Sequence, residues 1–361
     1  MFKVVQISAG HDNYFTPLRL IFAYMVLVGH AFVVIGGTSD SEPHVFFHFT
    51  FSYLAVNLFF IASGFLVTGS ILYSKNVKSF TISRFLRIYP GLIVHVLLLM
   101  LIFGPLTTNI PLTEYFANGD TLKQPFVVLP FIETDMTLPG ILASNHEQEA
   151  SAALWTLRYE ALAYIGTLIA FVLGLLKHRW MLLAQFLVFA IAFPLTQKLG
   201  IYDTLPATLQ SLLRFGLCYC LGAAIYGYRD VLKFHVALIP VFFIIAALVN
   251  DYVIFESVFT LALGYALFWI AYVKVPALKS LQDMGDVSYG LYIYHWAVLQ
   301  GVYYFMPHLN VWQLIAISGP IAAIIAALSW KFVEKPALKL KSRFSKAKKP
   351  IPTKATSSVT L

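Results

Sequence analysis

The sequence predicts an all-α integral membrane protein with about ten transmembrane helices and both termini in the cytoplasm. Of its 361 residues, 59% are hydrophobic and 12% are charged, about half the charged fraction of a soluble domain. The apolar residues gather in runs near the 20 or so that a helix needs to cross a bilayer. This composition excludes a soluble enzyme, a disordered chain and a secreted disulfide scaffold. The two cysteines, Cys218 and Cys220, point to different faces of a helix and predict no local disulfide.

Ten apolar segments are candidates for the membrane spans, with boundaries good to several residues. They are residues 15–36, 49–73, 86–104, 153–176, 180–196, 207–227, 235–250, 255–273, 287–306 and 311–333. The residues before the first span carry one lysine and no apolar core of their own. The start of the chain therefore does not resemble a cleaved signal peptide.

The basic residues indicate how these spans are oriented. With the N-terminus inside, the inner segments hold 20 of the 25 lysines and arginines, and the outer segments hold only Lys123 and Lys198. This distribution follows the positive-inside rule and predicts that both termini are cytoplasmic. Topology thus explains most of the net charge of +8. We expect the basic tail to contact anionic membrane lipids, and we expect no binding of nucleic acid.

The chain is expected to form one membrane domain, residues 1–340, followed by a basic, disordered cytoplasmic tail, residues 341–361. Residues 105–152 form the longest segment outside the spans and are expected on the outer side. Segments of that length are usually functional or disordered, and the apolar pieces of this one suggest that it lies on the membrane or covers a cavity. Because no separate soluble domain is present, any chemistry takes place within or at the edge of the membrane.

Ionisable residues inside a span are costly and mark candidate functional sites. Arg19 and His30 lie eleven residues apart in the first span. They therefore share one helical face, about 16 Å apart along the axis. A guanidinium at the inner mouth suits a phosphate, and a histidine deeper in the membrane suits a base. A purely structural role explains this pair equally well.

A second cationic feature stands at the start of the third span. Arg84 and Arg87, in the segment SRFLRIYP, are three residues apart and share a helical face. The free N–H groups at the start of a helix also favour anions. Together with Arg19, these residues predict a cytoplasmic site for a phosphorylated ligand.

The fourth span begins with ALWTLRYE. Its Trp155 is also typical of the aromatic belt at a membrane surface. Glu160, just inside the apolar run, either pairs with Arg158 or Arg214 or orients an imidazole, as the carboxylate of a catalytic dyad does.

Several other polar residues lie at membrane depth. Ser288, Tyr292 and His295 are spaced four and three apart and line one face of the ninth span, and an interhelical hydrogen bond would also explain the histidine. Asn57 and Ser63 in the second span either belong to a closely packed helix pair or mark a backbone approached by a ligand. No nucleotide-binding loop or HExxH-like spacing occurs, so we expect no metal.

Taken in order, these segments resemble the integral-membrane acyltransferase 3 family, bacterial transferases that O-acetylate surface polysaccharides. The resemblance covers roughly residues 12–340. It rests on Arg19 with His30, FFIASGFL, RFLRIYPG, LWTLRYE, and SYGLYIYH followed by VEKPAL. Each block is weak alone, but their order on ten spans is specific. Arg158 departs from the family pattern, which has a small residue or proline there, and this change bears on the outer acceptor mouth.

The resemblance implies a multi-pass protein of the bacterial cytoplasmic (inner) membrane. Its donor would be cytoplasmic acetyl-CoA, a substrate rather than a bound cofactor, and its acceptor a hydroxyl of a saccharide such as O-antigen or exopolysaccharide. Succinyl donors, nodulation-type oligosaccharides and peptidoglycan stay open.

The resemblance also implies roles for the site residues. Arg19, Arg84 and Arg87 would contact the CoA phosphates, His30 would be the essential catalytic residue, and Glu160 matches the acidic position of the tryptophan-containing block. His30 would act either as a general base in a ternary complex or as a transiently acylated carrier.

Two other functions fit a membrane protein of this composition. A transporter or flippase of lipid-linked saccharides would show paired repeats with broken helices, and we find none in the sequence. In a scaffold or receptor without catalysis, the same polar residues would have structural roles only.

Overall fold

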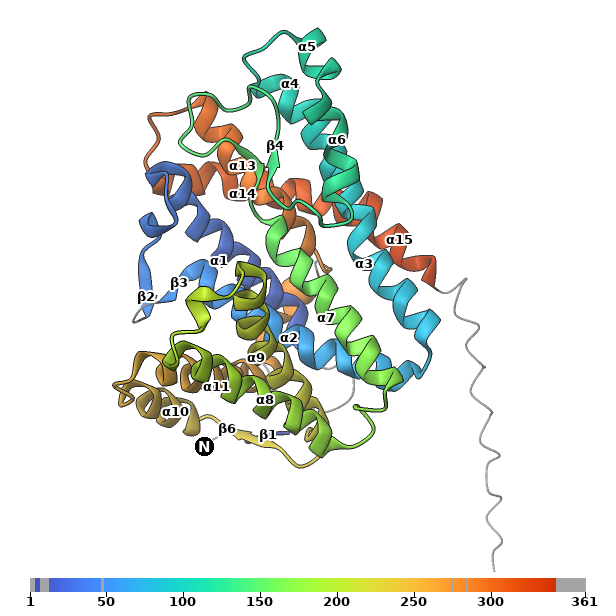
Figure 1. Cartoon of the computed structure of the whole chain (residues 1–361), viewed down its shortest axis with the longest axis vertical. Helices are drawn as coiled ribbons and strands as arrows, with labels where there is room; N and C mark the ends of the chain where they lie inside the picture. The colour runs from blue at the N-terminus through green and yellow to red at the C-terminus, as the bar shows by residue number, and fades with distance from the viewer. Residues whose placement is uncertain (1–3, 7–12, 47–48, 274, 284, 342–361) are drawn as a thin grey trace, which may run out of the picture.

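The computed structural model describes residues 4–6, 13–46, 49–273, 275–283 and 285–341, and it is a helical bundle (Figure 1). Each of the ten predicted spans coincides with a helix. These helices are α1 (Phe15–Gly36), α2 (Phe51–Ser74), α3 (Val77–Leu98), α7 (Leu154–Val172), α8 (Arg179–Lys198), α9 (Ala207–Gly227), α10 (Leu238–Ala247), α11 (Tyr252–Tyr272), α13 (Ser288–Phe305) and α14 (Val311–Ser329).

Not every helix is long and apolar enough to cross a bilayer. Within the described residues, seven helices meet that condition by length and composition: α1, α2, α8, α9, α11, and α3 and α14 with their continuations. Helix α10 has ten residues, or about 15 Å, half of the bilayer core. Helices α7 and α13 have 19 and 18 residues, but polar side chains lower their hydropathy. The count of ten crossings and the cytoplasmic termini stay predictions.

Two of the long helices change pitch before they end. Helix α3 continues through a π-helical turn, η2 (Leu99–Phe103), into α4 (Gly104–Thr107). Helix α14 continues through a second π-helical turn, η4 (Trp330–Glu334), into α15 (Lys335–Lys339), and both η4 and α15 pack against α3. Such turns redirect the side chains that follow them.

The segment predicted on the outer side, residues 105–152, is folded. It contains α5 (Leu112–Ala117), α6 (Gly119–Val128) and the antiparallel strands β4 (Met136–Thr137) and β5 (Glu149–Ser151), which lie at one end of the bundle (Figure 1).

Hydrogen bonds hold this segment to α13. Asn145 donates to the backbone carbonyl and the side-chain oxygen of Gln300 at 3.0 and 2.7 Å, and Trp296 Nε1 donates to the carbonyl of Glu149 at 2.9 Å. The segment therefore covers part of the helix that carries His295.

Two further strand pairs add a small β component to a fold predicted to be all-α. Strand β1 (Val4–Gln6) pairs with β6 (Lys233–His235), and β2 (His44–Phe46) pairs with β3 (Phe49–Thr50), both antiparallel. The remaining elements are short: η1 (Ser39–Ser41), η3 (Tyr202–Thr204) and α12 (Pro276–Asp283). The predicted basic tail lies outside the described residues, apart from its first residue.

Helix α2 packs closely against α9 because glycines let the two backbones touch. A Cβ atom added to Gly64 would lie 1.9 Å from the carbonyl oxygen of Tyr219, and one added to Gly222 would lie 2.0 Å from that of Ile61. Small residues are the usual means of such an approach between membrane helices. Close helix packing, one of the two interpretations of the second span, therefore holds at Gly64.

We expect Gly64→Ala to destabilise the protein by about 1–3 kcal/mol, because the methyl group must push two backbones apart. The midpoint of thermal unfolding of the detergent-solubilised protein measures this loss. A suitable control is Gly166→Ala in α7, where an added Cβ meets nothing within 4 Å, and it should leave the midpoint unchanged or higher. If Gly64→Ala has the same unfolding midpoint as Gly166→Ala, the α2–α9 contact is looser than the structure shows.

Candidate active site

Two cavities follow each other along helices α1, α2, α7 and α13. The arginine cavity is lined by Arg19, Ser63, Glu160 and Ser288, among others. The histidine cavity is lined by His30, Asp40, Glu42, Trp155 and Arg214, among others. Three residues line both cavities: Val56, Thr156 and Tyr292. Because Arg19 and His30 stand on one face of α1, about 16 Å apart, the cavities lie one beyond the other along the helix axes.

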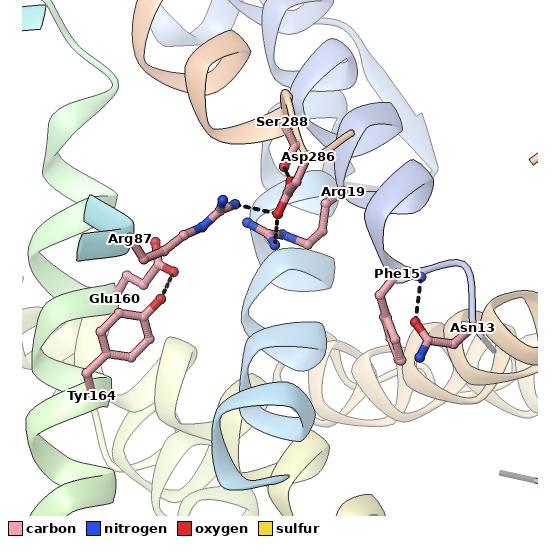
Figure 2. A network of polar contacts seen from close by, with 8 residues as sticks. All are labelled: Asn13, Phe15, Arg19, Arg87, Glu160, Tyr164, Asp286 and Ser288. Atoms are coloured by element: carbon pink, nitrogen blue, oxygen red, sulfur yellow. Dashed lines mark hydrogen bonds and ion pairs between the residues drawn. The ribbon is translucent and has the colours of Figure 1, made fainter. Parts of the chain in front are cut away.

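One carboxylate gathers two of the three predicted phosphate-binding arginines. Arg19 Nη1 and Arg87 Nη2 lie 3.1 and 2.8 Å from Oδ2 of Asp286, and the Ser288 hydroxyl donates to Oδ1 of Asp286 at 2.7 Å (Figure 2). Burial opposes ionisation of Asp286, but the two guanidiniums and the Ser288 hydroxyl hold its pKa well below its usual range. Asp286 thus ties the start of α13 to α1 and α3.

Asp286 was not among the site residues predicted from the sequence. Its only signal was an acidic residue in the segment GDVSYG, directly before the apolar run of the ninth span.

The third arginine and Glu160 meet through a tyrosine. The Arg84 guanidinium carbon lies 5.4 Å from the centre of the Tyr164 ring, and the Tyr164 hydroxyl donates to Oε1 of Glu160. Glu160 also interacts electrostatically with Arg87. The predicted arginines and Glu160 are therefore one cluster, to which Asp286 and Glu334 add two further carboxyl groups.

Glu160 and the two arginines considered as its partners make different contacts. Arg158 donates to the backbone carbonyls of Phe131 and Ile132, both at 3.0 Å. Arg214 donates from Nε to Asn57 Oδ1 at 3.0 Å. Asn57 therefore holds an arginine of the histidine cavity, whereas Ser63 lines the arginine cavity.

The two predicted histidines form a hydrogen-bonded pair between α1 and α13. His30 Nδ1 lies 2.8 Å from His295 Nε2, and His295 Nδ1 lies 2.7 Å from the carbonyl oxygen of Tyr292. A carbonyl only accepts, so a neutral His295 carries its proton on Nδ1 and accepts on Nε2. A neutral His30 then donates from Nδ1, which leaves its Nε2 unprotonated. His295 makes the interhelical hydrogen bond that was one interpretation of it, and its partner is His30.

Because His30 and Glu160 are on different helices, their spacing in the sequence does not show whether they are close. In the structure they line different cavities. Two carboxylates, Asp40 and Glu42, line the cavity of His30, and Glu42 accepts from the backbone N–H of Ser52 at 2.7 Å and from its hydroxyl. A Cβ added to Gly29, next to His30, would lie 2.0 Å from Glu42 Oε1. Nothing in the sequence separates Glu42 from the other acidic residues expected outside the membrane.

These features define a polytopic membrane protein with an arginine cluster at one end of α1 and a histidine pair at the other. The chain belongs to the acyltransferase 3 family, because the family's sequence model, described as an acyltransferase domain, matches residues 12–332. This membership confirms the resemblance drawn from the sequence blocks and makes the chain a membrane acyltransferase.

Two relatives are similar over nearly their whole length. An O-acetyl transferase of Shigella phage Sf6 is 25% identical over 335 residues, 90% of this chain and 95% of the relative. Nodulation protein 10 of Rhizobium leguminosarum bv. viciae is 27% identical over 360 residues, 93% of this chain and 95% of the relative. No solved structure matches the chain significantly.

Proposed function

We propose that the protein moves an acetyl group, or another short acyl group, from acyl-CoA to a hydroxyl of a cell-surface saccharide across the bacterial cytoplasmic membrane. The observation that carries the proposal is that Arg19, a member of the arginine cluster, and His30 line two cavities that follow each other along the same four helices. The relative named an O-acetyl transferase supports the reaction class. Family membership favours transfer over the alternative, a transporter or flippase of lipid-linked saccharides.

The arginine cavity is proposed as the donor site. Guanidinium groups bind phosphates through paired donors, and Arg19, Arg84 and Arg87 stand in one cluster. Pantetheine reaches roughly 15–20 Å when extended, by analogy with backbone reach, which is comparable to the Arg19–His30 separation. Glu160 lines this cavity, so we place its proposed catalytic role on the donor side.

The histidine cavity is proposed as the acceptor site. Nε2 of His30 takes the proton of the saccharide hydroxyl as its oxygen attacks the thioester carbonyl. The new C–O bond forms, the C–S bond breaks, and the sulfur of CoA leaves as a thiol with the proton from His30. In the covalent alternative the same nitrogen accepts the acyl group first and passes it to the hydroxyl. Initial-rate patterns distinguish the sequential route from the ping-pong route.

We expect Arg84→Ala and Arg87→Ala each to weaken acetyl-CoA binding by about tenfold or more, because each removes charge-assisted hydrogen bonds to phosphate. A binding titration with the purified protein measures the change. The exposed Lys78, on the same helix, provides the control Lys78→Ala, which should bind as the wild type does. Unchanged affinity in both arginine variants would show that CoA does not bind at this site.

The acceptor and the reaction are tested together by two experiments. Purified protein given labelled acetyl-CoA and a candidate glycan should form a labelled ester. Mass spectrometry of the surface glycans of cells with and without the gene should show the ester only where the protein is present. A transporter or a scaffold would form no ester in the purified system.

A further inference from the structure

The two cavities meet at a seam made of a few buried side chains. Val56, Thr156 and Tyr292 line both cavities, and each is at most 8% exposed. The three residues come from α2, α7 and α13, and α1 supplies Arg19 to one cavity and His30 to the other. Along α1, α2 and α7, the residues on one side of the seam line the arginine cavity and those on the other side line the histidine cavity.

A hydrogen bond between two hydroxyl groups closes the seam. The hydroxyls of Thr156 and Tyr292 are bonded to each other, and Thr156 Oγ1 also donates to the carbonyl of Ala153 at 3.2 Å. Since the Thr156 proton goes to this carbonyl, the Tyr292 hydroxyl is the donor within the pair. Thr156 is thus also held by its own helix, whereas the Tyr292 hydroxyl donates to Thr156.

The cavities as they stand do not admit the donor arm. The arginine cavity has a volume of about 50 Å³, room for a few water molecules, whereas the histidine cavity has about 340 Å³. Under the proposed function, the thioester must come from the arginine side to within bonding distance of a hydroxyl beside His30. Something between the cavities therefore has to move.

We propose that the seam is the passage for the acyl-pantetheine arm and that the Thr156–Tyr292 hydroxyl pair is its gate. This inference rests on the proposed function. Swinging the Tyr292 ring aside breaks this hydrogen bond and the edge contact of the ring with Phe59, and it joins the two cavities. The backbone carbonyl of Tyr292 stays in place, so it continues to accept from His295, and the tautomer of His30 is kept while the gate opens. One residue thus supplies a fixed backbone acceptor and a movable side chain.

A closed gate separates the thioester from the solvent of the histidine cavity when no acceptor is bound. Removing the gate should therefore expose the thioester to water. We expect Tyr292→Ala and Thr156→Ala to raise the ratio of acetyl-CoA hydrolysis to ester formation by about tenfold. Tyr292→Phe and Thr156→Val, which keep the size of the side chain and lose the hydrogen bond, should show a smaller increase. These conservative variants keep the test available if an alanine variant fails to fold.

A labelling experiment tests the gate without relying on catalysis. The two cysteines, Cys218 and Cys220, are first replaced by alanine, and a single cysteine is placed at Asp40, in the histidine cavity. Sealed vesicles receive a small membrane-impermeant methanethiosulfonate on the side where α1 begins. We expect almost no labelling with the gate intact, at least tenfold faster labelling in the Tyr292→Ala background and a smaller increase in the Tyr292→Phe background.

Two controls frame this experiment. Tyr294→Ala removes a tyrosine of the same helix whose hydroxyl donates to Ser329, away from the seam, and it should not change the labelling. A cysteine at the exposed Lys123 reports leaking vesicles.

Each outcome of the labelling experiment either supports or overturns the proposed gate. Equal labelling in the gate variants and Tyr294→Ala would overturn it, as would rapid labelling with the gate intact. Faster labelling in the gate variants, together with a wild type that forms no ester with any acceptor, would support the gated passage and refute the proposed function.

Discussion

His30→Ala is expected to abolish formation of the saccharide ester while the protein still inserts and folds. A positioned general base contributes about 10²–10⁴-fold to a rate, and the covalent route would lose its carrier altogether. In the wild-type structure, His295 presents its Nε2 to His30 and its Nδ1 to a backbone carbonyl. Both nitrogens of the second ring are therefore occupied.

The measurement is the rate of ester formation from labelled acetyl-CoA, together with the unfolding midpoint and the affinity for acetyl-CoA. Affinity should change little, because the arginine cluster lies about 16 Å away along α1. His178→Ala, at an exposed histidine, is the control and should be fully active. Normal ester formation by a folded His30→Ala protein would end the assignment of His30 as the catalytic residue.

The sequence predicted those parts of the fold and site that depend on one helix at a time. Apolar runs located all ten helices, and the eleven-residue spacing of Arg19 and His30 placed them at the two ends of one face. The short α10 was predicted as a span because its segment is apolar throughout, and hydropathy does not show where a helix ends. A turn before α11 ends this helix after ten residues. Helices α5 and α6 were not predicted, since prolines dominate the pattern of their segment.

Contacts between helices could not be predicted in the same way. The bond of Asp286 to both Arg19 and Arg87, the Thr156–Tyr292 pair and the position of Glu42 beside Gly29 depend on which helices are neighbours and how each is rotated. Glu160 illustrates the limit: its place in α7 was predicted, but only the rotation of α7 decides that it faces the arginine cavity. Spacing within a span carries no information about that rotation.

The second large effect is expected at His295, which acts through His30. In His295→Leu, Nδ1 of His30 loses its acceptor, and nothing then holds the proton on that nitrogen or fixes the ring. Replacing the residue that orients a catalytic histidine costs up to about 10⁴-fold when the wrong tautomer results. We expect kcat to fall by about 10²-fold or more and the KM for acetyl-CoA to stay within about twofold, because the donor phosphates bind at the other cavity.

His295→Gln separates positioning from packing. The glutamine amide oxygen reaches close to the place of Nε2 and accepts from His30 Nδ1, so this variant should recover a large part of the lost kcat. The ¹⁵N chemical shifts of the His30 ring should show one tautomer in the wild type and in His295→Gln, and a mixture in His295→Leu. A structural role for His295 would instead lower the unfolding midpoint, impair both variants alike and leave the tautomer of His30 unchanged. The tautomer is therefore the decisive readout, since only a histidine held through Nδ1 presents the free Nε2 that either route of acyl transfer requires.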